Sequence, residues 1–190
     1  MAALEGSAAS LGRQNSGTIG SNRTILGNLG MDMDEMFDLV YLGYNPSADA
    51  LQNGQIEMMS TPAGPPVTAV TRAFANMGNE ISLLEFTEEQ RVEANGDFED
   101  LWTTFTIPAG TYPGQDEDVT TIAQPNFLAV NADVPEETVY LITKTIYENL
   151  PFLQAIHPAT NAMSLDSALA GLPLPLHPGA LRYYEEVGLD

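Results

Sequence analysis

The chain has 190 residues and no cysteine, and its six Lys and Arg against 26 Asp and Glu give a net charge of −20. This length supports one large domain or two small ones. The lack of cysteine excludes disulfides, thiol nucleophiles and Cys-ligated metal sites. The negative charge argues against nucleic acids and acidic lipid surfaces as partners, because both would be repelled.

Neither a membrane span nor a signal peptide is visible in the sequence. No apolar run reaches the length needed to cross a bilayer, and no basic segment precedes an apolar stretch. Lys144 is the only lysine. A surface so acidic is typical of adaptation to high salt, where screening removes the self-repulsion.

Strand and helix patterns alternate along the first half of the chain. Short apolar runs predict four strands, at residues 9–12, 37–44, 56–61 and 81–86. Helical patterns with Pro or Thr near the start and Gly near the end predict four helices, at residues 17–29, 45–55, 65–78 and 87–96. This alternation predicts βαβ units and an α/β fold with a mostly parallel sheet flanked by helices.

The second half has a different character. Residues 105–130 are rich in Gly and Pro and end in an extended run. A helix should follow, opened by a capping box between Asp133 and Glu136, with one apolar stripe made by Val139, Ile142, Ile146 and Leu150. Shorter helices are predicted at 164–171 and 179–188. The prolines of the connecting "LPLPLHPG" segment should keep it extended.

A small polar loop, "RQNSGT" at residues 13–18, joins the first strand to the first helix. The helix start offers unpaired backbone N–H groups, Ser16 and Thr18 add hydroxyls, and Gly17 lets a ligand approach the backbone. These features predict a site for a carboxylate or phosphate. The alternative is that Ser16 or Thr18 only caps the helix. Arg13 could bind a carboxylate through its guanidinium fork, or could pair with an acidic side chain instead.

A second loop of the same design, "STPAGPP" at residues 60–66, follows the third strand. In open α/β sheets ligands bind outside the carboxyl ends of the strands. Both loops could therefore face one crevice, although an ordinary Pro/Gly turn is an equal alternative for the second.

Catalytic and metal motifs are missing from the sequence. It contains no G-x-x-x-x-G-K-[ST], G-x-G-x-x-G or G-x-S-x-G. The acidic triplet at residues 116–118 lacks the pattern of a calcium loop, and His157 and His177 lie too far apart for a metal signature. We therefore expect a protein without catalytic activity, bound metal or cofactor, in which both histidines are structural or exposed.

Several strings of the chain are similar to those of one known family. "IPAGTYPGQDEDVTTIAQPNFLAV" and "LPLPLHPGALRYYEEVG" lie in the second half, and "SLGRQNSGT" and "ADALQNGQIEMMSTPAGPP" in the first. Together they resemble the TAXI family, the solute-binding receptors of tripartite ATP-independent periplasmic (TRAP) transporters. The resemblance covers nearly the whole chain from about Leu4.

The resemblance implies a two-lobed periplasmic-binding-protein fold. Such a receptor lies outside the cytoplasm, binds glutamate or a related dicarboxylate, and delivers it to the membrane subunits of the transporter without chemistry. The implied ligand contacts are in the two loops, with Tyr112 as a lid or wall residue where the chain crosses between lobes. With the adjoining Arg13 and Asn15, the predicted set is Arg13, Asn15, Ser16, Gly17, Thr18, Thr61, Ala63, Gly64 and Tyr112.

Measured against the family, the chain should be incomplete. Residues 1–118 are expected to form the second lobe, and residues 119–190 a crossing strand and helices that return to a missing first lobe. An apolar face left uncovered would favour self-association through the residues after Thr120. Arg13-Gln14-Asn15 replaces the small tripeptide usual in the family, so the ligand could differ. A truncated lobe that binds nothing, or an enzyme on the same architecture, are the remaining alternatives.

Overall fold

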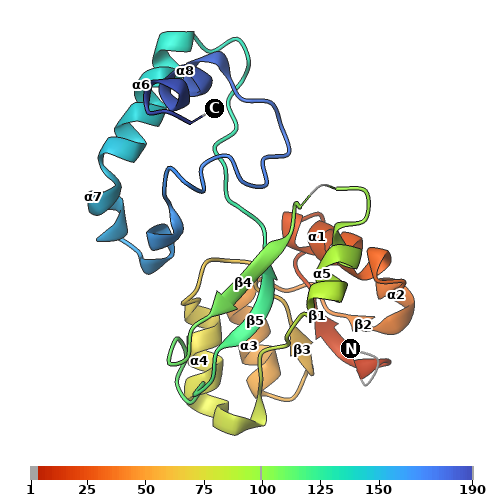
Figure 1. The fold of residues 1–190 in the computed structure, drawn as a ribbon. Coiled ribbons are helices and arrows are strands. Elements are labelled where there is room, and N and C mark those ends of the chain that lie inside the picture. The colour runs from red at the N-terminus through yellow and green to blue at the C-terminus, as the bar shows by residue number, and fades with distance from the viewer. Residues whose placement is uncertain (1–3, 99, 190) are drawn as a thin grey trace. The chain divides into compact units, whose positions relative to one another are not determined.

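The computed structural model describes residues 4–98 and 100–189, and the chain divides into two compact units, Met1–Ala123 and Gln124–Asp190. In the first unit, β1 (Ala8–Ser10) lies between β2 (Asp38–Leu39) and β3 (Met58–Met59), and both pairings are parallel. Helices accompany these strands (Figure 1). The predicted α/β class with a parallel sheet flanked by helices is therefore confirmed.

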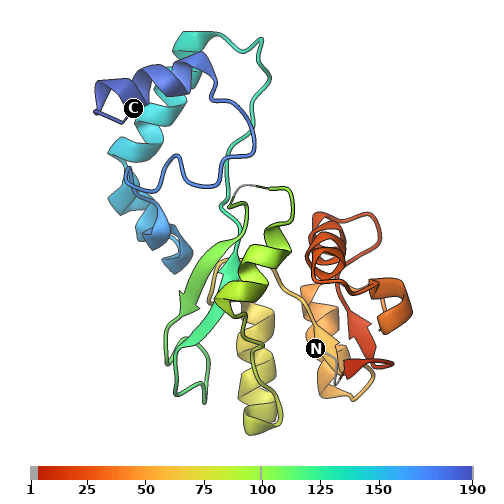
Figure 2. The same cartoon turned by 45° about the vertical axis from the view of Figure 1, so that its right-hand side comes forward.

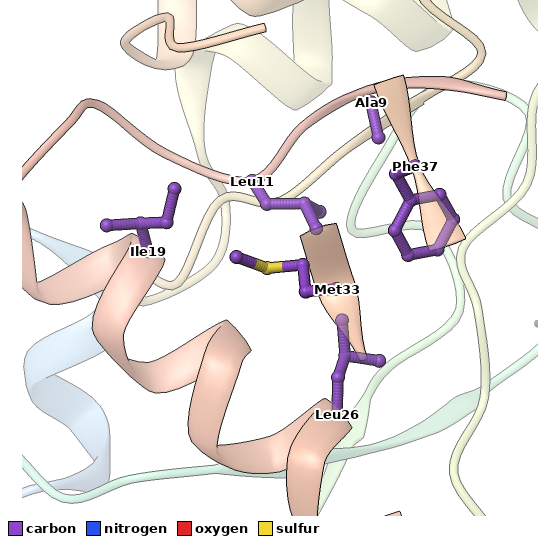
Figure 3. Packing of buried hydrophobic residues seen from close by; sticks show 6 residues of the cluster. All are labelled: Ala9, Leu11, Ile19, Leu26, Met33 and Phe37. Atoms are coloured by element: carbon purple, nitrogen blue, oxygen red, sulfur yellow. The ribbon is translucent and has the colours of Figure 1, made fainter. Parts of the chain in front are cut away.

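Consecutive residues of β1 point to opposite faces of the sheet. Ala9 joins an apolar cluster with α1 (Gly17–Asn28) and α2 (Met33–Met36), whose side chains point toward one another in Figure 3: Ala9, Leu11, Ile19, Leu26, Met33 and Phe37. Ser10 faces the other way, and its hydroxyl lies 2.7 Å from that of Ser47 on α3 (Tyr44–Gln52). Helices therefore cover both faces of the sheet.

Helices α3 and α4 (Thr68–Met77) lie side by side (Figures 1 and 2). They approach closely because their contact is built on Ala48, Ala69 and Ala73. The predicted helix ends are confirmed: α4 stops at Gly78, with φ of 56°. As predicted, Thr87 opens α5 (Glu88–Asn95), with a capping box to Gln90.

A separate antiparallel hairpin completes the first unit. β4 (Thr103–Ile107) pairs along its whole length with β5 (Val119–Ala123). β5, which the sequence division places with the C-terminal segment, thus pairs within the first unit. In the connection between the two strands, the Tyr112 ring stacks on Phe74 of α4, with ring centroids 5.6 Å apart.

The second unit consists of helices and irregular segments. Helices α6 (Glu136–Glu148) and α8 (Pro178–Glu186) pack through the rings of Tyr140, Tyr147, Tyr183 and Tyr184. Between them lie α7 (Leu150–Gln154) and the 3-10 helix η3 (Pro158–Ala162). Gly179 permits the close approach of α8, because a Cβ there would lie 2.7 Å from the Tyr140 backbone nitrogen.

Three strand predictions in the first unit are wrong in extent or kind. The strand expected at 37–44 is only the two residues of β2, and its aromatic end already belongs to α3. The strand expected at 56–61 is only the two residues of β3. Residues 81–86 form no strand. Phe86 donates its backbone N–H to the Thr120 carbonyl, but the Glu85 carboxylate takes the Thr120 N–H in place of a backbone acceptor, so no ladder forms.

Three helix predictions in the second unit need correction. Helix α6 has Pro135 rather than Asp133 at its N-cap, so the predicted capping box is absent from these described residues. Its buried side chains are Val139, Tyr140 and Thr143, whereas Ile142 is 36% exposed. The tyrosines of α8 pack against the face of α6 that carries Tyr140, and this contact determines which side is buried. Residues 164–171 form turns instead of a helix. Among the helices described, none is both long and apolar enough for a bilayer crossing.

Candidate functional site

A hollow of about 330 Å³ lies where the chain leaves β1 and β2. Arg13, Ser16 and Thr18 line it from the loop and helix start after β1. Residues 42–46 line it from the segment after β2, where α3 begins. Two helix starts therefore meet at one depression, at the carboxyl edge of a parallel sheet, where α/β proteins place their ligands.

The start of α1 is closely held. The Ser16 hydroxyl accepts from the Ile19 N–H (3.3 Å) and donates to the Arg13 carbonyl (2.7 Å), so Ser16 is the helix cap. Because the Ser16 hydroxyl proton is already donated to the Arg13 carbonyl, it is not available to a ligand. Within the described residues, the backbone N–H groups of Gly17 and Thr18 donate to no protein acceptor, and neither does the Thr18 hydroxyl. These three donors remain available to a ligand.

The start of α3 has less capping than that of α1. Its N-cap is Gly43, which offers no side chain, and the N–H groups of Tyr44 and Asn45 have no acceptor in the described part of the chain. Neither α1 nor α3 has an acidic residue in its first turn, although α5 and α6 do. The partial positive charges of both helix starts are thus left uncompensated by side chains.

Arg13 adds a full positive charge at this place. Its guanidinium rests on Gly43, since a Cβ at residue 43 would lie 2.7 Å from both Nε and Nη2 of Arg13. The other five basic side chains pair with carboxylates: Arg23, Arg72, Arg91, Lys144 and Arg182. Arg13 forms no ion pair with any acidic residue that the structure describes. A cation held against two positive helix ends favours an anion between them.

A family model for the NMT1-like family matches residues 1–188. The chain belongs to the NMT1-like family. This is a family of periplasmic-type binding proteins, with a solute-binding role in transport rather than a catalytic one. Its members are typically extracytoplasmic.

In this NMT1-like protein, the residues predicted from the first loop come together only in part. Arg13, Ser16 and Thr18 line the hollow. Asn15 is exposed beside it in a left-handed conformation, with φ of 58°. Gly17 is also exposed, and a Cβ there would meet no atom within 4 Å, so its surface is open to a ligand.

The second predicted loop lies next to the hollow without lining it. Thr61, Ala63 and Gly64 are absent from its wall. The Tyr44 hydroxyl nevertheless donates to the Pro62 carbonyl at 3.2 Å, which joins the start of α3 to this loop.

Tyr112 takes the position of a supporting residue rather than of an exposed lid. Its side chain is 3% exposed, and its hydroxyl accepts from the Val67 N–H at the end of the second loop (3.2 Å). Burial raises the pKa of this phenol above its ordinary value of 10.0. The residue remains protonated near neutrality.

Sequence reasoning missed the contribution of residues 43–46. The sequence predicts a helix at residues 45–55, close to the observed start of α3 at Tyr44, but it indicates no ligand contact at this helix start. Gly43 followed three residues later by Pro46 was the available signal, since Pro is favoured in a first helical turn.

The two histidines have structural positions, as predicted. The Nδ1 atoms of His157 and His177 accept the N–H groups of Ala159 and Gly179, each two residues further on, at the starts of η3 and α8. Within residues 4–98 and 100–189, no group of three or more His, Asp or Glu side chains is placed to hold a metal ion.

Proposed function

We propose that this protein binds a small organic acid, glutamate or a similar dicarboxylate, as the extracytoplasmic receptor of a TRAP transporter of the TAXI type. It would hand the ligand to membrane subunits, and the two units would correspond to one lobe and to the returning part of another. The observation that carries the proposal is Arg13. It is the one basic residue without an ion pair among those described, and it lies in a hollow with two helix starts.

The contacts that would hold a carboxylate follow from these positions. Its oxygens accept from the N–H groups of Gly17 and Thr18 and from the Thr18 hydroxyl, while the Arg13 guanidinium neutralises its charge. Hydrogen bonds to a charged group contribute about 1.5–3 kcal/mol each. A second acidic group would reach the start of α3 or the loop at Thr61, Ala63 and Gly64. Asn15 would close the rim of the site.

A thermal-shift panel on the whole chain tests the proposal. The panel holds glutamate, 2-oxoglutarate, succinate and phosphate in high salt. A ligand that binds only the folded state stabilises it by about 2.7 kcal/mol at a hundredfold excess over Kd. We expect one dicarboxylate to raise the melting temperature more than the others and more than phosphate. No shift with any compound, over a clean unfolding transition, would contradict the proposal.

A second candidate is an interaction module that self-associates through the residues after Thr120. It is favoured by large apolar side chains exposed in the second unit: Leu128 is 67% exposed, Phe152 69% and Ile156 65%. Light scattering separates the two candidates. An apparent mass that rises with protein concentration, and rises less in Phe152→Glu, would support self-association. A monodisperse monomer at all concentrations would exclude it.

A further inference from the structure

Asn22 of α1 connects the two segments that leave the sheet at β1 and β3. The Nδ2 atom of its half-buried side-chain amide lies within hydrogen-bond distance of three oxygens, which share its two hydrogens: the carbonyls of Thr18 (2.9 Å) and Leu11 (3.1 Å), and the Ser60 hydroxyl (3.0 Å). Leu11 directly follows β1, and Ser60 directly follows β3. One side chain therefore bonds to the residue that follows β1, to the first turn of α1 and to the first residue of the second loop.

The order of the strands places this contact where open α/β sheets bind ligands. In the order β2-β1-β3, the chain passes from β1 to one neighbour and then crosses to the other side. The crevice beside such a reversal is where open α/β sheets bind ligands. The Ser60 backbone N–H also donates to the Ser10 carbonyl at 2.9 Å. Asn22 thus joins the loops at the carboxyl ends of β1 and β3.

The chemistry of the surroundings selects an amide at residue 22. All three partners are oxygens, so the group facing them must be a donor, and a carboxylate there would meet the lone pairs of two carbonyls. The Asn22 bonds also use the Thr18 carbonyl, in the same residue whose N–H and hydroxyl are available to a ligand. The geometry of the candidate site and that of the second loop are therefore coupled through one residue.

We propose that Asn22 is a positioning residue that fixes the spacing between the start of α1 and the loop Thr61–Gly64, so that the site favours acids with two carboxylates over acids with one. This inference rests on the proposed function. A monocarboxylate contacts the start of α1 alone and does not depend on that spacing. A dicarboxylate that reaches both loops does depend on it.

The experiment compares succinate and acetate in the whole chain and in three variants. Asn22→Ala removes the connection, and Ser60→Ala removes only the hydroxyl acceptor and keeps the backbone bond to Ser10. The matched control is Asn28→Ala, in the same helix, whose side chain bonds the Ala94 carbonyl at 2.7 Å and touches neither loop. We expect Asn22→Ala and Ser60→Ala to weaken succinate about fivefold to tenfold, as for the loss of a hydrogen bond, and acetate less than about twofold. Asn28→Ala should leave both affinities unchanged.

Two readouts keep the inference separate from the proposed function. If Asn22→Ala and Ser60→Ala lose equal affinity for succinate and acetate, or lose none for either, the positioning role is overturned. If the unmodified protein binds neither acid, the proposed function fails. Nitrogen-15 relaxation of the amides of Thr61, Ala63 and Gly64 then tests whether Asn22 holds the second loop to the start of α1. Greater motion in Asn22→Ala and Ser60→Ala but not in Asn28→Ala supports it, and unchanged motion in all three rejects it.

Discussion

Among the charged residues, Arg13 has the most unusual surroundings. In a chain with 26 acidic side chains, a surface arginine has many possible partners, and Arg23 on the next helix finds Asp34. Arg13 instead lies on the backbone at Gly43, where a Cβ would collide with its guanidinium. The sequence placed Arg13 beside the loop, but its lack of an acidic partner required the structure.

Gly17→Ala separates ligand access from folding. A Cβ at residue 17 meets nothing within 4 Å, so the melting temperature without ligand should be unchanged or higher, because alanine is favoured over glycine in helices. The same Cβ would stand over the open N–H groups and lower carboxylate affinity. Thermal shifts with the best dicarboxylate measure both effects. Gly20→Ala, also open and on α1, is the control, and equal affinity in the two variants would remove Gly17 from the site.

The sequence could predict local residue roles better than contacts between distant residues. The cap at Ser16 and the glycine that ends α4 follow from local chemistry, and both are observed. Asn22 was not singled out, because an asparagine within a helix looks like any other polar surface residue. Its partner Ser60 is 38 residues away in the sequence. Such contacts depend on strand order, which local patterns do not encode.

At the level of elements, α6 and α8 are held together by a charged group as well as by the tyrosine cluster. Glu186 of α8 accepts from the Tyr140 hydroxyl (2.6 Å) and from Lys144 Nζ (2.9 Å), both on α6. These two hydrogen bonds hold the pKa of Glu186 below its ordinary value of 4.5. The Arg182 guanidinium lies over the Tyr140 ring, 3.9 Å from its centroid.

This contact predicts a pH dependence with a definite sign. Because the pKa of Glu186 is lower in the folded chain, its contribution to stability is fully present above pH 4.5 and is lost as the pH falls through the lowered value. Glu186→Gln should therefore unfold more easily than the unmodified chain near neutrality, and the difference should shrink in acid. The near-ultraviolet circular dichroism of the tyrosines, followed during melting at several pH values, measures this difference in stability. Glu185→Gln removes the same charge one residue away, and an identical profile for both variants would refute the assignment.

Helix prediction in the second unit shows the limit of periodicity. The spacing of Val139, Ile142 and Ile146 indicated one buried stripe, yet Ile142 is exposed and Tyr140 is buried. Aromatic rings from α8 cover a neighbouring face of α6, and this tertiary contact overrides the local pattern. In the first unit, strand and helix alternation was sufficient for the fold class because each strand of the parallel sheet precedes a helix that packs on the sheet.

For the whole molecule, net charge should dominate the response to salt. The net charge of −20 leaves far more repulsive than attractive pairs, so screening should stabilise the folded chain even though it weakens the surface ion pairs. We expect the melting temperature to rise with NaCl, which separates screening from the exclusion effects of sulfate. A melting temperature that falls as NaCl is added would mean that the ion pairs outweigh the repulsion.

Ligand binding by this protein should depend most on Arg13, and titration calorimetry of two charge-matched variants tests this role. Arg13→Ala and Arg23→Ala each remove one positive charge from the same region, but only Arg13 lines the hollow. With the dicarboxylate that gives the largest thermal shift, Arg13→Ala should weaken binding about tenfold or more, as expected for lost hydrogen bonds to a charged group. Arg23→Ala should stay within about twofold of the unmodified chain, because Arg23 pairs with Asp34 outside the hollow and salt screens its charge. Equal affinities in the two variants would contradict the site.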